Sequence, residues 1–252
     1  MNKLFVFDLD DTLIDNVHDY AKPILDAAWL IIQTLGAKAP HVSKIIAMEQ
    51  EIDLRRVKEI NPDTGKPFLY SMERFPGSLV STYNEICQSI KMTPIKETQK
   101  KLYDIGLMAF DKEMYYQNIK PYALELIHFL SRWNDELILY TKGDERVQNN
   151  KIIALAHKGV MQFFTDIVIA DQKNANTFAK FATRCSGRCY SVGNSFNADI
   201  APALATPGFS GILIPVETWD TIGKTKFESA DNVDNLYVLD NLAQIMDIYP
   251  RL

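Results

Sequence analysis

The sequence has few cysteines and lacks a long apolar segment. Its 252 residues include three cysteines, Cys87, Cys185 and Cys189, an odd number without the spacing of paired zinc ligands. We therefore expect reduced, buried thiols rather than a metal site. The longest apolar stretch, residues 24–35, is interrupted by polar residues and is too short to span a bilayer, so we expect no membrane partner.

The chain also lacks a block of one charge, an internal repeat and a low-complexity tract. Its 27 Lys and Arg and 32 Asp and Glu are mixed along the sequence and give a net charge of −5. Without a basic cluster, nucleic acid is not an expected partner. The first expected strand begins at Leu4, which leaves no room for a signal peptide, so we expect a cytoplasmic protein.

The most informative segment is an acidic cluster directly behind an apolar run. Residues 4–7 are apolar and predict a buried strand, and Asp8, Asp10 and Asp11 follow at once. Like charges at the end of a buried strand repel each other and lose hydration, which is unfavourable. Such a cluster is tolerated when a cation neutralises it or when one of the carboxylates takes part in a reaction. An acidic turn or a helix N-cap would use the same residue types, so this segment alone leaves both interpretations open.

From residue 120 on, the pattern alternates between helices and strands. Helices are expected over 121–133, 145–158 and 176–184 and from Asn241 on, and strands over 137–140, 166–170, 190–192 and 211–215. Asp144 is the expected N-cap of the second of these helices. Such alternation predicts an α/β fold with a parallel sheet covered on both faces. Polar residues follow the expected strands at Asp8, Thr141, Lys173 and Asn194, and ligands of open parallel sheets bind at that edge.

Residues 16–118 interrupt this alternation. Apolar residues at helical spacing predict helices over 19–35, 42–59, 79–90 and 96–116, with turns over 61–67 and 74–77. We therefore predict two domains, an α/β core made of residues 1–15 and 119–252 and an inserted α-helical cap of residues 16–118.

In its motifs, the chain resembles the haloacid dehalogenase (HAD) superfamily, and specifically its phosphatase-type members. The similarity lies in four motifs that occur in the family's order: residues 7–13, Thr141, Lys173 and residues 193–199. The resemblance implies a Rossmann-like core with the first strand in the centre and a helical cap between the first and second motifs.

The resemblance also implies roles for the two aspartates of the first motif. Asp8 would be the nucleophile that forms an aspartyl-phosphate. Asp10 would be the general acid and base, and its backbone carbonyl would bind the metal. The dehalogenases of the superfamily lack an aspartate at this second position, so Asp10 favours phosphate chemistry. Asp11 and Thr12 are expected only to shape the loop.

The later motifs would bind the phosphoryl group. Thr141, Lys142 and Gly143 are candidate substrate-binding residues, because a hydroxyl and backbone N–H groups before a helix can hold phosphoryl oxygens. Lys173 would pair with Asp8 and the phosphoryl group, and its place in the loop after a strand favours it over Lys180.

The fourth motif departs from the family pattern. Asn194 stands where an acid is common, and Asp199 follows at the expected spacing. The implied Mg²⁺ ligands are therefore Asp8, Asp10, Asn194 and Asp199, with one negative charge fewer than usual. In the cap, Arg74 is a candidate substrate contact.

The resulting prediction is a Mg²⁺-dependent phosphomonoester hydrolase that acts on a small phosphorylated metabolite. Sugar phosphates and nucleoside monophosphates are equally open as substrates. A phosphotransferase or phosphomutase with the same site is an alternative, and a non-catalytic HAD-fold binding protein is another. The sequence leaves the oligomeric state open.

Overall fold

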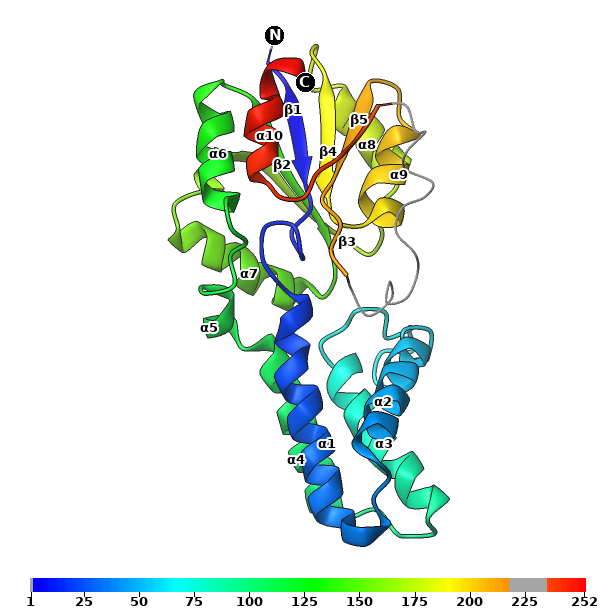
Figure 1. Cartoon of the computed structure of the whole chain (residues 1–252). Coiled ribbons are helices and arrows are strands. Elements are labelled where there is room, and N and C mark those ends of the chain that lie inside the picture. Colours follow the sequence, from blue (N-terminus) through cyan, green and yellow to red (C-terminus); the bar gives the residue numbers. More distant parts are fainter. Residues whose placement is uncertain (1, 218–234) are drawn as a thin grey trace. The chain divides into compact units, whose positions relative to one another are not determined.

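The computed structural model describes residues 2–217 and 235–252, and the chain divides into two units (Figure 1). Unit 1 consists of Met1–Asn16 and Lys112–Leu252, and unit 2 of Val17–Asp111. The predicted cap, 16–118, extends further toward the C-terminus than unit 2. The difference arises because helix α5 (Lys112–Tyr115) packs against helix α7 (Glu145–His157), which belongs to unit 1.

In the part of the chain that the structure describes, unit 1 is built on one six-stranded parallel sheet of order β3-β2-β1-β4-β5-β6. The strands are β1 (Leu4–Phe7), β2 (Glu136–Lys142), β3 (Phe164–Ala170), β4 (Cys189–Gly193), β5 (Phe209–Leu213) and β6 (Leu236–Val238). The predicted parallel α/β sheet is confirmed, and β1 lies between β2 and β4, where the strand order reverses (Figure 1). β6 is the one strand among these that the sequence did not predict.

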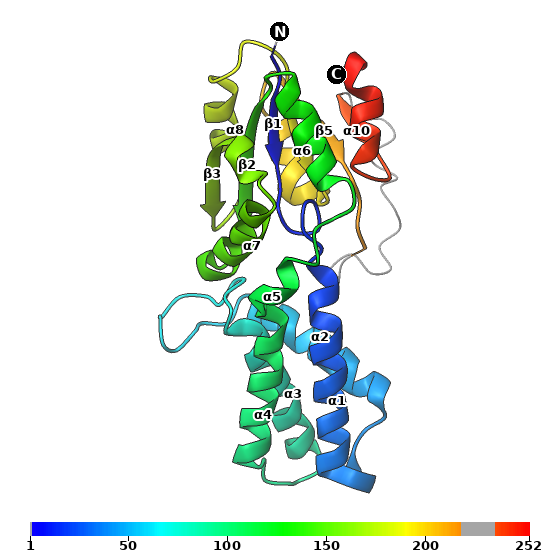
Figure 2. The same ribbon diagram turned by 90° about the vertical axis from the view of Figure 1, so that its left-hand side faces the viewer.

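Successive side chains of each strand point to opposite faces of the sheet, and helices pack against both faces. Leu4 and Val6 of β1 belong to a buried cluster with Phe178 of α8 (Ala175–Ala182) and Ala203 of α9 (Ala201–Leu204). On the other face, Phe5 stacks on Tyr249, which follows helix α10 (Ala243–Ile248). Helix α10 packs against α6 (Ala123–Arg132), as Figure 2 shows. The sheet is therefore covered on both sides, as parallel sheets require.

Local capping explains where several helices of unit 1 begin. The predicted N-cap of α7 is confirmed, because the side chain of Asp144 accepts a hydrogen bond from the N–H of Arg146. Asn174 caps α8 in the same way through the N–H of Thr177, so this helix begins at Ala175. Helix α6 begins at Ala123, later than predicted, because Tyr122 has a left-handed φ of 67°.

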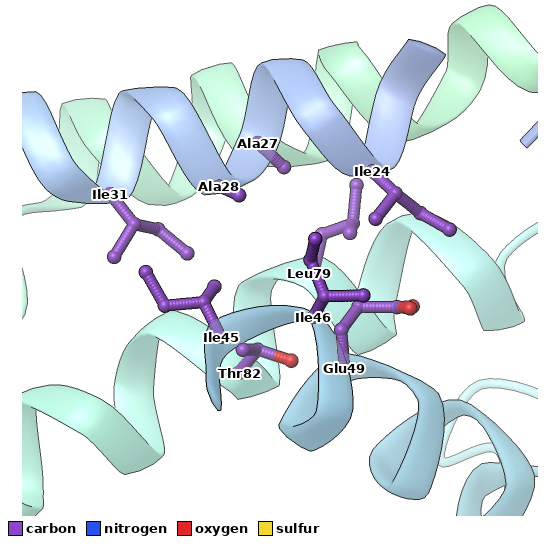
Figure 3. Close-up of a pocket in the computed structure, with 9 residues that line it drawn as sticks. All are labelled: Ile24, Ala27, Ala28, Ile31, Ile45, Ile46, Glu49, Leu79 and Thr82. Atoms are coloured by element: carbon purple, nitrogen blue, oxygen red, sulfur yellow. The ribbon is translucent and has the colours of Figure 1, made fainter. Parts of the chain in front are cut away.

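Unit 2 is a bundle in which α1 and α3 each pack against both α2 and α4. The helices are α1 (Ala21–Leu35), α2 (Val42–Arg56), α3 (Arg74–Ser89) and α4 (Lys96–Leu107). Their apolar faces form one buried core that includes Ile31, Ile45 and Leu79. A small cavity of about 10 Å³ lies in this core. Figure 3 shows Glu49 and Thr82 among the aliphatic side chains that line it. Among the described residues, no helix has the length and apolar character needed to cross a membrane.

Two predicted boundaries in unit 2 are wrong. The expected turn over 74–77 is the first turn of α3, because Pro76 is tolerated where a helical N–H has no partner within the helix. The expected helix over 96–116 ends at Leu107, and a 3₁₀ turn (Met108–Phe110) follows. Asp111 then has an extended backbone, which separates α4 from α5.

Candidate active site

The carboxyl end of β1 is the place where the four sequence motifs meet. Phe7 pairs with Leu139 of β2 and with Val192 of β4, and the N–H of Asp8 continues the ladder to Val192 O at 2.9 Å. Asp8 therefore lies at the point where the strand order reverses. This is the position at which open parallel sheets bind their ligands.

Lys173 joins Asp8 to Asp199. Its Nζ lies 2.5 Å from Asp8 Oδ1 and 2.7 Å from Asp199 Oδ1, and its side chain is 2% exposed. The loop that carries it is held by Tyr140, whose hydroxyl accepts a hydrogen bond from the N–H of Asn174. Lys180, in contrast, is exposed on α8. The structure therefore brings the favoured lysine, and not its neighbour, to the nucleophile candidate.

Burial dominates the electrostatics of this group. It raises the pKa of Asp8 to about 7, and the Asp199 carboxylate acts in the same direction, while Lys173 opposes the shift. For Lys173, burial disfavours the charge, but Asp199 and Asp8 more than offset it and raise the pKa of the ammonium. The site therefore keeps a buried positive charge between two carboxyl groups.

The fourth motif forms a tight turn that aims Asp199 back at Lys173. The N–H of Ser195 donates to Asp199 Oδ2 at 2.9 Å, and the hydroxyl of Ser191 donates to the backbone carbonyl of Asp199 at 2.8 Å. Gly193 is needed here because a Cβ at this position would overlap the Asp199 side chain. Asn194 follows at the end of β4 and is half-buried.

Asp10 is held by residues that the sequence analysis did not identify. Gln148 Nε2 donates to Asp10 Oδ2 at 2.9 Å, and Lys151 Nζ lies 2.5 Å from Asp10 Oδ1. Lys151 Nζ also donates to Asn16 Oδ1 at 2.6 Å. Both oxygens of the Asp10 carboxylate are therefore fixed by helix α7.

A sequence signal for these residues exists in α7. Its buried positions, Val147, Gln148, Lys151, Ala154 and Leu155, follow the spacing of an apolar helix face. A glutamine and a lysine on such a face are out of place unless they have buried partners. This pattern could have marked Gln148 and Lys151 as site residues.

Asp11 and Thr12 shape the loop after β1, as predicted. Asp11 has a left-handed φ of 60°, and its carboxylate accepts a hydrogen bond from the N–H of Asn16 at 2.8 Å. The hydroxyl of Thr12 donates to Asp8 Oδ2 at 3.1 Å. These bonds connect Asp8 and Asn16 to residues in the middle of the loop.

The second motif lies against the same network. Thr141 is fully buried, and its hydroxyl donates to Gln148 Oε1 at 3.3 Å. Gly143 has a φ of 144°, and a Cβ there would come within 2.7 Å of Gln148 Nε2. Gly143 thus permits the close approach of Gln148, while Lys142 is half-buried at the end of β2. Phosphoryl binding by these three residues stays a prediction.

Arg74 belongs to unit 2 and forms an ion pair with Asp53. It is buried in the first turn of α3 and contacts both the carboxylate and the backbone carbonyl of Asp53. This pairing accounts for its position in the helical bundle. Its predicted role as a substrate contact stays a prediction.

The donor atoms at the strand ends suit a magnesium ion with few carboxylate ligands. Asp8 and Asp199 offer carboxylates, Asn194 an amide oxygen and Asp10 a backbone carbonyl, and all of these are hard donors. Within residues 2–217 and 235–252, no three His, Cys, Asp or Glu side chains converge as a metal cluster. Magnesium keeps several waters and needs only one or two carboxylates, so the donor set fits this ion.

Comparison with known proteins assigns the fold. No protein-family model and no curated protein matches the sequence. Among solved structures, a haloacid dehalogenase-like family hydrolase from Xanthomonas campestris is similar, with a TM-score of 0.69 and 19% identity over 99% of this chain and 91% of that chain. A 2-haloacid dehalogenase from Pseudomonas syringae pv. tomato has a TM-score of 0.53 and 21% identity over 100% and 99% of the two chains.

A HAD phosphatase from Thermococcus onnurineus is also similar, with a TM-score of 0.55 and 14% identity over 99% of this chain and 98% of that chain. At these identities the likeness concerns the fold. The chain has the α/β fold of the haloacid dehalogenase superfamily, as its motifs predicted. Because both dehalogenases and phosphatases share that fold, the reaction has to be argued from the site.

Proposed function

We propose that the protein is a HAD-type hydrolase and, more specifically, a Mg²⁺-dependent phosphomonoesterase of a small phosphorylated metabolite. The observation that carries the proposal is the separate anchoring of two carboxylates in one loop. Asp8 is buried and paired with Lys173, whereas Asp10 is a quarter exposed and held by Lys151. The Lys173 ammonium favours the ionised form of Asp8 that a nucleophile needs, and the partial exposure of Asp10 leaves that carboxyl group accessible to a leaving oxygen and to water.

In the first step, an oxygen of Asp8 attacks phosphorus, and the bond from phosphorus to the ester oxygen breaks. Asp10 gives its proton to the leaving oxygen, so an alcohol departs and an aspartyl-phosphate remains. In the second step, Asp10 takes a proton from water as that water attacks phosphorus. Inorganic phosphate leaves, and the Asp8 carboxylate is regenerated.

The other side chains stabilise charge during these steps. The Lys173 ammonium offsets the negative charge that would otherwise repel Asp8 from a phosphate. In the proposal, Thr141 and the N–H groups that follow it hold the phosphoryl oxygens. Asp8, Asn194, Asp199 and the Asp10 carbonyl would bind Mg²⁺, which supplies neutralising charge to the phosphoryl group when bound.

The alternatives use the same framework. A dehalogenase needs Asp8 as a nucleophile, but its leaving group is a halide and not an oxygen that must be protonated. That reaction would therefore give the anchored Asp10 no role. A phosphotransferase or phosphomutase differs only in its acceptor, a hydroxyl in place of water. A binding protein without activity would need neither anchored aspartate. The cytoplasmic location expected from the sequence stays part of the proposal.

The test is phosphate release from p-nitrophenyl phosphate, with Mg²⁺ and with EDTA, by the wild type, Asp8→Asn and Asp10→Asn. Asp63→Asn, at an exposed position of unit 2, is the matched control. We expect Mg²⁺-dependent release by the wild type and the control and a loss of at least about 10³-fold in Asp8→Asn. Chloride release from 2-chloropropionate without phosphatase activity would instead establish a dehalogenase.

A further inference from the structure

Lys151 is a buried lysine for which helix packing offers no reason. It lies in the middle of α7, where it is 1% exposed. Lysine is almost never fully buried unless its charge is paired. Here the ammonium meets two oxygens, Asp10 Oδ1 and Asn16 Oδ1, and the ring of Tyr115 lies 5.3 Å away.

Both oxygens that Lys151 binds come from the loop after β1. Asp10 stands near the start of that loop and Asn16 at its end, so one ammonium ties the two together. Gln148 binds the second carboxylate oxygen of Asp10 from the preceding turn of the same helix. An ammonium has three donors and no acceptor, so it fixes where these oxygens lie.

Stability alone would favour an apolar side chain at position 151. Burying an ion pair costs desolvation, and well-packed apolar replacements are often neutral or stabilising. Asp10 retains 26% of its side-chain exposure, so it would not be left as a buried, unpaired charge if the lysine were absent. The lysine is therefore better explained by what it does to the orientation of Asp10.

We propose that Lys151, fixed by Asn16, is a positioning residue that holds the Asp10 carboxyl group in the orientation needed for proton transfer. This inference rests on the proposed phosphatase function and adds a residue to it. Proton donation matters most when the leaving group is strongly basic. Loss of Lys151 should therefore slow the hydrolysis of phenyl phosphate much more than that of p-nitrophenyl phosphate, whose leaving group is a weaker base.

The experiment compares both esters in the wild type, Lys151→Met, Asn16→Ala, Asp10→Asn and the double variant Lys151→Met/Asp10→Asn. Lys158→Met, at the exposed C-cap position directly after α7, is the control. In Lys151→Met, kcat should fall about 10²-fold on phenyl phosphate and less than about 10-fold on p-nitrophenyl phosphate, with KM nearly unchanged. Asn16→Ala should show the same preference with a smaller loss.

The double variant separates positioning from a merely structural role. If Lys151 acts through Asp10, then Lys151→Met should cause no further loss in the Asp10→Asn background. Equal losses on both esters, or additive losses in the double variant, would overturn the positioning role while leaving the phosphatase proposal intact. No phosphate release by the wild type from either ester would overturn both proposals. Lys151→Gln serves as the test variant if Lys151→Met does not fold.

Discussion

The two units bury charge in different ways. In unit 1, three aspartates lie beyond the ends of β1 and β4. Lys173 contacts Asp8 and Asp199, and Lys151 contacts Asp10. In unit 2, Glu49 and Asp53 lie on α2 and meet Arg74 and Ser78 of α3. Ser78 Oγ donates to Glu49 Oε1 at 2.8 Å, and Arg74 pairs with Asp53.

The surroundings of the two clusters differ as much as their members. The cluster of unit 1 lies among loops that present backbone N–H groups and carbonyls, and it carries more carboxylates than ammonium groups. Glu49 instead faces the small cavity between aliphatic side chains of α1, α2 and α3 (Figure 3). Burial and the nearby Asp53 raise the pKa of Glu49 to about 7. In the proposed function the unit 1 cluster accepts a cation, whereas the charges of the unit 2 cluster are balanced once Glu49 holds a proton.

The largest effect should come from removing the Lys173 ammonium group from the unit 1 cluster. Lys173→Met leaves Asp8 and Asp199 facing each other without the ammonium between them. We expect phosphatase activity to fall by at least about 10³-fold, because that charge stabilises the transition state. Steady-state kinetics on p-nitrophenyl phosphate would show this, with exposed Lys180→Met as the control. A loss of less than threefold would remove Lys173 from the mechanism.

The corresponding change in unit 2 should affect stability and not catalysis. Arg74→Met removes the partner of the buried Asp53, and breaking a buried pair costs about 3–5 kcal/mol. Urea denaturation should show this loss while KM stays within about twofold of the wild-type value. Arg55→Met, at an exposed ion pair, is the control and should cost less than about 1 kcal/mol. A large rise in KM with little loss of stability would instead support Arg74 as a substrate contact.

The free energy of unfolding should depend on pH because of Glu49 in the unit 2 cluster. Its pKa is raised from 4.5 to about 7, so the folded state retains a proton that the unfolded state has lost. This contribution to stability is complete below pH 4.5 and is lost as pH rises through 7, by about 3 kcal/mol in all.

Glu49→Gln should remove this part of the decline in stability with rising pH, because an amide cannot ionise. The measurement is the free energy of unfolding between pH 4.5 and 8. Exposed Glu51→Gln on the same helix is the control and should follow the wild type. An unchanged slope in Glu49→Gln would mean that Glu49 is ionised in the folded protein.

The smallest effect should come from adding a charge to the unit 1 cluster. Asn194→Asp places a carboxylate where the family pattern has an acid, so Mg²⁺ should bind more tightly. We expect activity to be retained and the Mg²⁺ concentration for half-maximal rate to fall severalfold. A metal titration of the rate measures this. Complete loss of activity would show that Asn194 has a role other than metal binding.

The sequence predicted the parts of the molecule that depend on local pattern. The strand before Asp8, the alternation after residue 120 and the choice of Lys173 over Lys180 all follow from periodicity and from position after a strand. The Asp144 cap was equally readable, because its hydrogen bond is made two residues away.

What the sequence did not predict depends on contacts between distant segments. Gln148 and Lys151 contact Asp10 only because α7 packs beside the loop after β1, which lies more than 130 positions away in the chain. Arg74 was expected in a turn, because Pro76 and Gly77 resemble a turn sequence. The pairing of Arg74 with Asp53 in the neighbouring helix was not visible in the local pattern.

The central place of β1 has a consequence for the protein's synthesis. β1 is made first, but its partners β2 and β4 begin only at Glu136 and Cys189. The helices of unit 2 lie between β1 and β2 in the sequence, and they bury their own apolar core. On the ribosome, we therefore expect unit 2 to fold while the aspartates after β1 still wait for Lys151, Lys173 and Asp199 to emerge.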